Sequence, residues 1–133
     1  MLTNKQAHHN LSRLKDSFNN AKEEALNIRK NDATEYDEKI KQFDELEKKC
    51  IATTLNDNDI DKSFIIGIHS LLKEYKSGTP GKINAYKGFL LKYVDGDVED
   101  LLDYMERDLY NVYYHNIKHK ILLVDIEAGK LKY

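Results

Sequence analysis

Residues 95–114 hold the densest set of side chains in this chain that could recognise another protein. The stretch contains seven carboxylates against one arginine, a formal balance of −6, and four of the nine tyrosines. Carboxylates attract a basic partner and form ion pairs with it, while tyrosine supplies a stiff contact area with one polar end. These residue types together predict a surface that binds a basic protein.

A helical wheel divides this stretch into two faces. The apolar face, which we expect in the core, consists of Val98, Leu101, Leu102, Met105, Leu109, Val112 and Tyr113. The opposite face, which we predict to bind the partner and call the acidic-tyrosine face, consists of Glu99, Asp100, Asp103, Arg107, Tyr110 and Tyr114. Two tyrosines four residues apart on an exposed acidic face lower solubility, so their presence favours a binding surface.

Two other patterns bear on metal binding. The segment Asp57-Asn58-Asp59-Ile60-Asp61 begins like a calcium loop, with acids at alternate positions. Lys62 stands where that loop needs glycine, and Ile68 where it needs a bidentate glutamate, so the pattern indicates a polar loop between helices. His115 and His119 share one helix face, but they lack a third ligand and any His-Glu-x-x-His motif. We therefore expect no metal and no cofactor.

Nucleophilic and phosphate-binding motifs are also missing from the sequence. Cys50 lies in an apolar stripe, which is typical of a buried small hydrophobe. The segment Gly78-Thr79-Pro80-Gly81-Lys82 lacks the spacing of a P-loop, and no Gly-x-Ser-x-Gly occurs. The prediction is a protein that is not an enzyme.

One short pattern resembles a known enzyme family. Arg107-Asp108 followed by His115 is similar to the HEPN ribonucleases, helical domains of comparable size. In that family four to six residues separate an arginine from a histidine, and both face one pocket, usually in a dimer. The resemblance implies RNA cleavage by Arg107 and His115. In this chain seven residues intervene, which places the two side chains about 80° apart on an ideal helix. A HEPN-like ribonuclease is the alternative function.

Composition narrows the class of partner. The net charge is −2, and 18 of the 21 basic residues are lysine, whereas bidentate contacts to phosphate and guanine prefer arginine. No stretch reaches the ~18 apolar residues that span a membrane, and the first residues have no apolar signal core. A single cysteine excludes an internal disulfide. We expect a cytoplasmic location and neither nucleic acid nor membrane as partner.

Turn-forming and helix-breaking residues are rare, with six glycines and one proline, and their scarcity favours helices. The predicted fold is all-α: a single domain over residues 1–133, built as a bundle of four to five helices with an N-terminal helical hairpin and a long C-terminal helix. A capping box at Thr3–Gln6 opens the first helix, which runs to Lys30. The second follows with Asp32 or Thr34 as N-cap, and its stripe extends to Thr54.

The later helices have their own start signals. The third begins near Asp59 and is the most hydrophobic, so we expect it at the centre of the bundle. The fourth opens with Thr79 as N-cap and Pro80 at the first helical position. The fifth begins at Asp97.

The fifth helix changes its apolar stripe part of the way along. Asn116, Lys120 and Glu127 fall where core residues should continue. A second stripe takes over, formed by Tyr110, Tyr114, Ile117, Ile121, Val124 and Ala128. Either the helix is long and turns this stripe to another surface, such as a second copy of the chain, or it ends near His119 and residues 121–126 are extended.

These observations predict a small non-enzymatic binding protein that neutralises or modulates a more basic protein partner through the acidic-tyrosine face. Immunity proteins, antitoxins and inhibitors encoded by phages or plasmids act in this way. Two alternatives come from other classes: a HEPN-like ribonuclease, and a structural protein that forms a homo-oligomer through its C-terminal helix.

Overall fold

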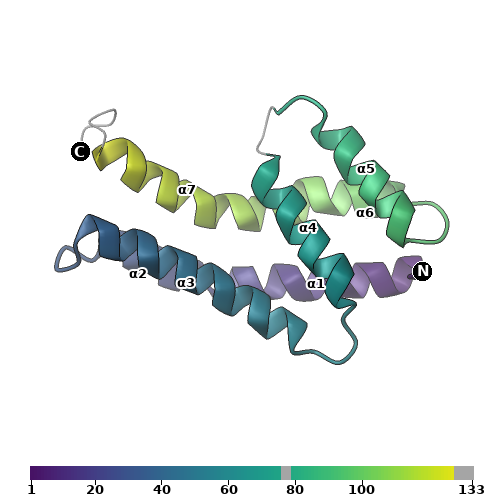
Figure 1. The fold of residues 1–133 in the computed structure, drawn as a ribbon, viewed down its shortest axis with the longest axis horizontal. Coiled ribbons are helices and arrows are strands. Elements are labelled where there is room, and N and C mark those ends of the chain that lie inside the picture. Colours follow the sequence, from purple (N-terminus) through teal and green to yellow (C-terminus); the bar gives the residue numbers. More distant parts are fainter. Residues whose placement is uncertain (76–78, 128–133) are drawn as a thin grey trace.

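The computed structural model, shown in Figure 1, describes residues 1–75 and 79–127. Its elements are α1 (Asn4–Asn20), α2 (Lys22–Lys30), α3 (Tyr36–Leu55), α4 (Lys62–Glu74), α5 (Lys82–Tyr93), α6 (Glu99–Tyr104), the π-helical turn η1 (Met105–Leu109) and α7 (Tyr110–Glu127). Because α1 and α2 form one bent helix, and α6, η1 and α7 follow one another directly, the described residues form five helices. The all-α prediction is confirmed.

The helices pack around α1. In Figure 1, α1 and α2 lie beside α3 as the predicted N-terminal hairpin, and α7 runs along it, while α4, α5 and α6 cover the end nearer the N-terminus. α1 packs against α2, α3, α4, α6, η1 and α7. The third predicted helix, α4, completely buries Phe64, Ile65, Ile68 and Leu72, as expected for an inner helix, although α1 is the element most of the others share.

The first helix begins as predicted but bends. Thr3 Oγ1 accepts the Gln6 amide at 3.1 Å, and Gln6 Oε1 accepts the Thr3 amide at 2.9 Å, which completes the capping box. At Ala21 the amide bonds back three residues to the Phe18 carbonyl at 3.2 Å, which tightens the turn and separates α1 from α2. The preceding Asn19 and Asn20 are weak helix formers, consistent with a bend at this point.

The other helix starts correct the prediction by a few residues. α3 begins after Glu35, so neither Asp32 nor Thr34 is its N-cap. α4 begins after Asp61, whose carboxylate accepts the Phe64 amide at 3.0 Å. The reason is local, because side chains in the loop before each helix accept hydrogen bonds from amides of the same loop. The Asp57 carboxylate, for example, accepts the Asp59 amide at 3.1 Å.

The start of α5, at residues 79–82, has a different geometry from the predicted one. The carbonyl of Thr79 accepts the Lys82 amide at 3.3 Å, and Gly81 has φ 79° and ψ 0°. These values are those of the third residue of a type II turn, with proline ahead of it, so Thr79 and Pro80 form a turn instead of capping α5. Gly81 is the residue that permits the left-handed backbone there.

The helix after residue 98 contains one π turn. The Tyr110 amide donates to the Met105 carbonyl, five residues back instead of four. One extra residue in a turn rotates everything after it by about 100° relative to an ideal α-helix. As a result Met105, Leu109, Tyr110 and Tyr113 all face the core. Tyr110, where the second stripe begins, is also where this π turn ends. The helix continues to Glu127, so residues 121–126 are helical.

A short contact joins the first residues to the loop between α5 and α6. The Leu2 amide donates to the Tyr93 carbonyl at 2.9 Å, and the Asp95 amide donates to the Leu2 carbonyl at 2.9 Å, so Leu2 and Val94 form an isolated parallel bridge. Val94 and Val98 are buried on either side of the loop. The start of α1 and the start of α6 are thereby held together.

Two helical glycines should respond in opposite ways to substitution by alanine. A Cβ on Gly67 of α4 would lie 2.3 Å from Phe89 Cζ of α5, whereas a Cβ on Gly88 meets nothing within 4 Å. We expect Gly67→Ala to lower the free energy of unfolding by about 1–3 kcal/mol through overpacking. Gly88→Ala should raise it by up to about 1 kcal/mol, because alanine is the better helix former. Urea denaturation of both variants measures the difference, and equal effects would contradict this packing.

Candidate functional site

The acidic-tyrosine face is already engaged within the chain. Glu99 Oε1 lies 2.8 Å from Lys87 Nζ of α5, and this contact raises the pKa of Lys87. Asp103 Oδ1 lies 3.1 Å from Arg107 Nε, four residues along the helix, and the Arg107 side chain is 77% exposed. Such exposed pairs are worth little and exchange readily for a partner's charges. Glu99, Asp103 and Arg107 thus stay accessible to a partner.

Asp100 has a structural task. Its Oδ1 accepts the side-chain amide of Asn4 at 2.9 Å, and its Oδ2 lies 3.4 Å from His8 Nε2. The hydrogen bond from Asn4 contributes most to lowering the pKa of the Asp100 carboxyl. The same Asn4 amide also donates to the Asp97 carbonyl at 3.3 Å. Asp100 therefore reinforces the Leu2–Val94 bridge by tying α1 to α6.

The placement of Tyr110 corrects the wheel. An exposed position was predicted, but only 8% of Tyr110 is exposed. The π turn at residues 105–109 rotates this side chain inward. Lys82 Nζ of α5 lies over its ring, 4.0 Å from the centroid, in a cation–π contact. The sequence could not predict this contact, because the two residues are far apart in the chain.

Tyr114 is the exposed aromatic of the pair. It is 43% exposed, and its ring stacks on that of Tyr110 with centroids 6.2 Å apart. Tyr110 therefore supports Tyr114 from the core side and fixes its position. Of the two predicted aromatic anchors, Tyr114 alone presents a large exposed area.

Further carboxylates on the same segment are exposed. Asp95 and Asp97 precede α6, and Asp108 lies in η1; among the described residues none of the three forms an ion pair. The wheel did not select them, because two lie in a loop and one lies within the π turn. Together with Asp103 they form what we call the acidic surface: Asp95, Asp97, Asp103 and Asp108.

The residues of the ribonuclease alternative do not meet. Arg107 pairs with Asp103, and His115 lies eight residues further along the helix, roughly 12 Å away at 1.5 Å per residue. Both are exposed. Within one chain this geometry does not bring Arg107 and His115 into a shared pocket.

The calcium-like loop gains one neighbour in the structure. Ligand atoms of His9, Asp57 and Asp59 lie within 4.8 Å of one another. Arg13 Nε already lies 2.9 Å from Asp57 Oδ2, and the hydrogen bond from the Asp59 amide contributes most to lowering the pKa of the Asp57 carboxyl. The guanidinium supplies the positive charge that the loop's carboxylates need. His115 and His119, the other predicted pair, both lie on α7.

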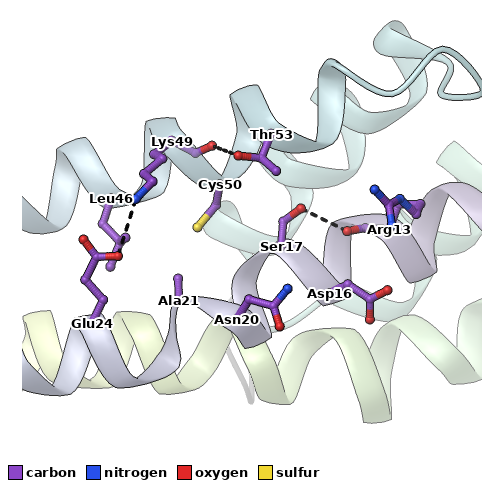
Figure 2. Close-up of a pocket in the computed structure, with 10 residues that line it drawn as sticks. All are labelled: Arg13, Asp16, Ser17, Asn20, Ala21, Glu24, Leu46, Lys49, Cys50 and Thr53. Atoms are coloured by element: carbon purple, nitrogen blue, oxygen red, sulfur yellow. Dashed lines mark hydrogen bonds and ion pairs between the residues drawn. The ribbon is translucent and has the colours of Figure 1, made fainter.

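A hollow of about 220 Å³ opens between α1–α2 and α3, as Figure 2 shows. Its rim carries charges of both signs from Arg13, Asp16, Glu24 and Lys49. Cys50 lines it but is only 4% exposed, and burial, followed by the nearby Glu24 carboxylate, raises the pKa of its thiol to about 11. A thiol held protonated in this way is a poor nucleophile, in agreement with the predicted burial of Cys50.

The remaining predictions concern membranes and self-association. Among residues 1–75 and 79–127, no helix combines the length and the apolar character needed to cross a bilayer. In the second stripe, Tyr110 is buried within the chain, whereas the side chains of Ile117, Ile121 and Val124, and Ala128 as a whole, lie outside the described residues. Self-association through that stripe stays a prediction.

Removal of the Asp100 side chain should loosen the tie between α1 and α6. We expect Asp100→Ala to lower the free energy of unfolding by about 0.5–1 kcal/mol, the usual value of one exposed hydrogen bond, because Asn4 loses its acceptor. Since the pKa of Asp100 is lowered in the fold, the difference should shrink as the pH falls through that lowered value. Asp103→Ala is the control, and urea denaturation at pH 7 and pH 3 measures both.

Substitution of each of the two stacked tyrosines should show that Tyr110 belongs to the core and Tyr114 to the surface. Tyr110→Ala should cost about 3 kcal/mol of unfolding free energy, because it empties a buried site. Tyr114→Ala should cost less than about 1 kcal/mol, because its ring is partly exposed. Thermal unfolding gives both values; similar losses would mean that Tyr114 belongs to the core.

Comparison of the chain with protein-family models, curated proteins and solved structures finds no match. Its function must therefore be inferred from its own geometry and charge.

Proposed function

We propose that this chain is a non-enzymatic binding protein that holds a more basic protein partner against the acidic surface. The observation that carries the proposal is the charge of residues 95–108, seven carboxylates against one arginine, with Asp95, Asp97 and Asp108 exposed and outside any ion pair among the described residues. Unpaired exposed carboxylates at one end of a molecule steer a basic partner and suppress acidic ones.

The contacts around this surface suggest how binding would proceed. The weak exposed pairs Lys87–Glu99 and Arg107–Asp103 can open so that a partner's cations replace the internal ones. Tyr114, placed on the Tyr110 ring, supplies the apolar anchor, since partly exposed aromatics commonly carry much of the energy of an interface. The partner is blocked by occlusion, as in immunity proteins, antitoxins and phage or plasmid inhibitors.

Neutralisation of the acidic surface should abolish capture of the partner. The test uses tagged chain in cells of the native host and a variant with Asp95→Asn, Asp97→Asn, Asp103→Asn and Asp108→Asn. A control carries Glu23→Gln, Asp32→Asn, Glu38→Gln and Glu45→Gln, four exposed carboxylates elsewhere with the same change of net charge. We expect wild type and control to retain one basic protein that salt elutes, and the variant to retain at least tenfold less, because each lost ion pair weakens an electrostatic interface.

Three outcomes would contradict the proposal. The variant and the control could lose the partner equally, which would make the effect one of net charge alone. The retained species could be a second copy of this chain, which light scattering detects and which favours the self-associating alternative. The purified chain could cleave RNA in a manner abolished by Arg107→Ala or His115→Ala, which would establish the ribonuclease alternative.

A further inference from the structure

Three aromatic rings from three helices meet at the middle of the bundle. Phe18 of α1 lies 4.3 Å from Tyr113 of α7 and 6.0 Å from His69 of α4, measured between ring centroids, and His69 lies 5.6 Å from Tyr113. His69 Nδ1 and Tyr113 Oη are 2.7 Å apart, within hydrogen-bond distance. Phe18 and Tyr113 are 2% and 1% exposed. The histidine is thus part of the contact that joins α7 to α1 and α4.

The chemistry of this pair depends on the charge of the imidazole. A neutral ring can accept the Tyr113 proton at Nδ1, whereas a doubly protonated ring has no lone pair to offer. On protonation Nδ1 becomes a donor to Tyr113 Oη, so the contact reverses and the tyrosine O–H loses the acceptor that the described contacts give it. A full positive charge must then be held in a largely buried site. Both changes weaken the contact between α4 and α7.

The surroundings give the charged ring little support. From α3, the Glu47 carboxylate favours the charged ring, but Lys73 of α4 lies 3.0 Å from that carboxylate and opposes its effect. Lys120 of α7 is likewise paired with Asp44 of α3 at 2.7 Å. Burial raises the pKa of Cys50 and of Tyr113, so both stay uncharged. The pKa of His69 is accordingly lowered from its ordinary value of 6.5, with burial as the main cause.

We propose that the His69–Tyr113 pair is an acid-sensitive latch, and that protonation of His69 loosens α7 from α1 and α4. The neutral ring keeps the latch closed above pH 6.5. As the pH falls from 6.5 towards the lowered pKa of His69, the unfolded and opened states bind the proton first, and the latch loses stability. The segment that opens begins at the π turn, where α7 joins η1.

Hydrogen exchange on the full chain tests the latch. Between pH 7.5 and 5.0, after correction for intrinsic exchange rates, protection of the amides at residues 111–116 should fall by up to about tenfold for each pH unit by which the His69 pKa is lowered. The amides of α5 should change less than about twofold. Equal loss in α5 would indicate global unfolding, and unchanged protection in α7 would show that no latch exists; either result overturns the proposal.

Two variants identify the titrating group. His69→Gln cannot titrate but can accept the Tyr113 hydroxyl, so the acid-dependent loss should disappear, while the matched control His8→Gln on α1 should retain it. If His69→Gln fails to fold, Tyr113→Phe keeps the ring and removes the hydroxyl. The His69 ring, followed by nuclear magnetic resonance, should then titrate at higher pH, since the neutral form has lost its donor. Persistence of the loss in His69→Gln, or an unmoved titration in Tyr113→Phe, would falsify the latch.

Discussion

The hydrogen bond from the Tyr110 amide to the Met105 carbonyl decides which residues of the last helix meet the core. An α-helical continuation from Met105 would direct Asn116 and Lys120 inward, where their polar groups would need partners. The π turn rotates the helix, so that Tyr110 and Tyr113 are buried. Asn116 and Lys120 lie half-buried beside them with partners, Asn116 donating to the Val112 carbonyl and Lys120 pairing with Asp44. The core contact with α1 and α4, and the support under Tyr114, both depend on that rotation.

The carboxylates of this segment fall into two groups, one that packs helices together and one that faces solvent. Before the π turn, Asp100 faces Asn4 and His8 and serves the packing of α1 against α6. Asp103 and Asp108 face solvent. An acidic helix can bear this density of like charge because lysines of the neighbouring α5 lie close: Lys87 meets Glu99, and Lys82 covers Tyr110. Repulsion between carboxylates remains in the loop before α6, which holds Asp95 and Asp97, and in η1, which holds Asp108.

Periodicity predicted the class of fold and most of the core, because burial repeats every three to four residues in any amphipathic helix. Phe64, Ile68, Leu101 and Met105 are buried as their spacing indicated. The capping box at Thr3 could be predicted from the sequence because all its atoms lie within four consecutive residues. The wheel failed at Tyr110, since it assumes 100° per residue and one π turn violates that assumption. Contacts such as Lys82 with Tyr110, or Asn4 with Asp100, join residues far apart in the chain and leave no local pattern.

The bridge between Leu2 and Val94 has a consequence for the order in which the chain assembles. A contact across some ninety residues closes a very long loop, so its entropic cost is met only after the intervening helices have packed. During synthesis the hairpin of α1–α2 with α3 can form while α5 is still inside the ribosome, but Leu2 has no backbone partner in this bridge until residues 93–95 have emerged. Leu2 is thus placed late in folding, although it lies directly before α1.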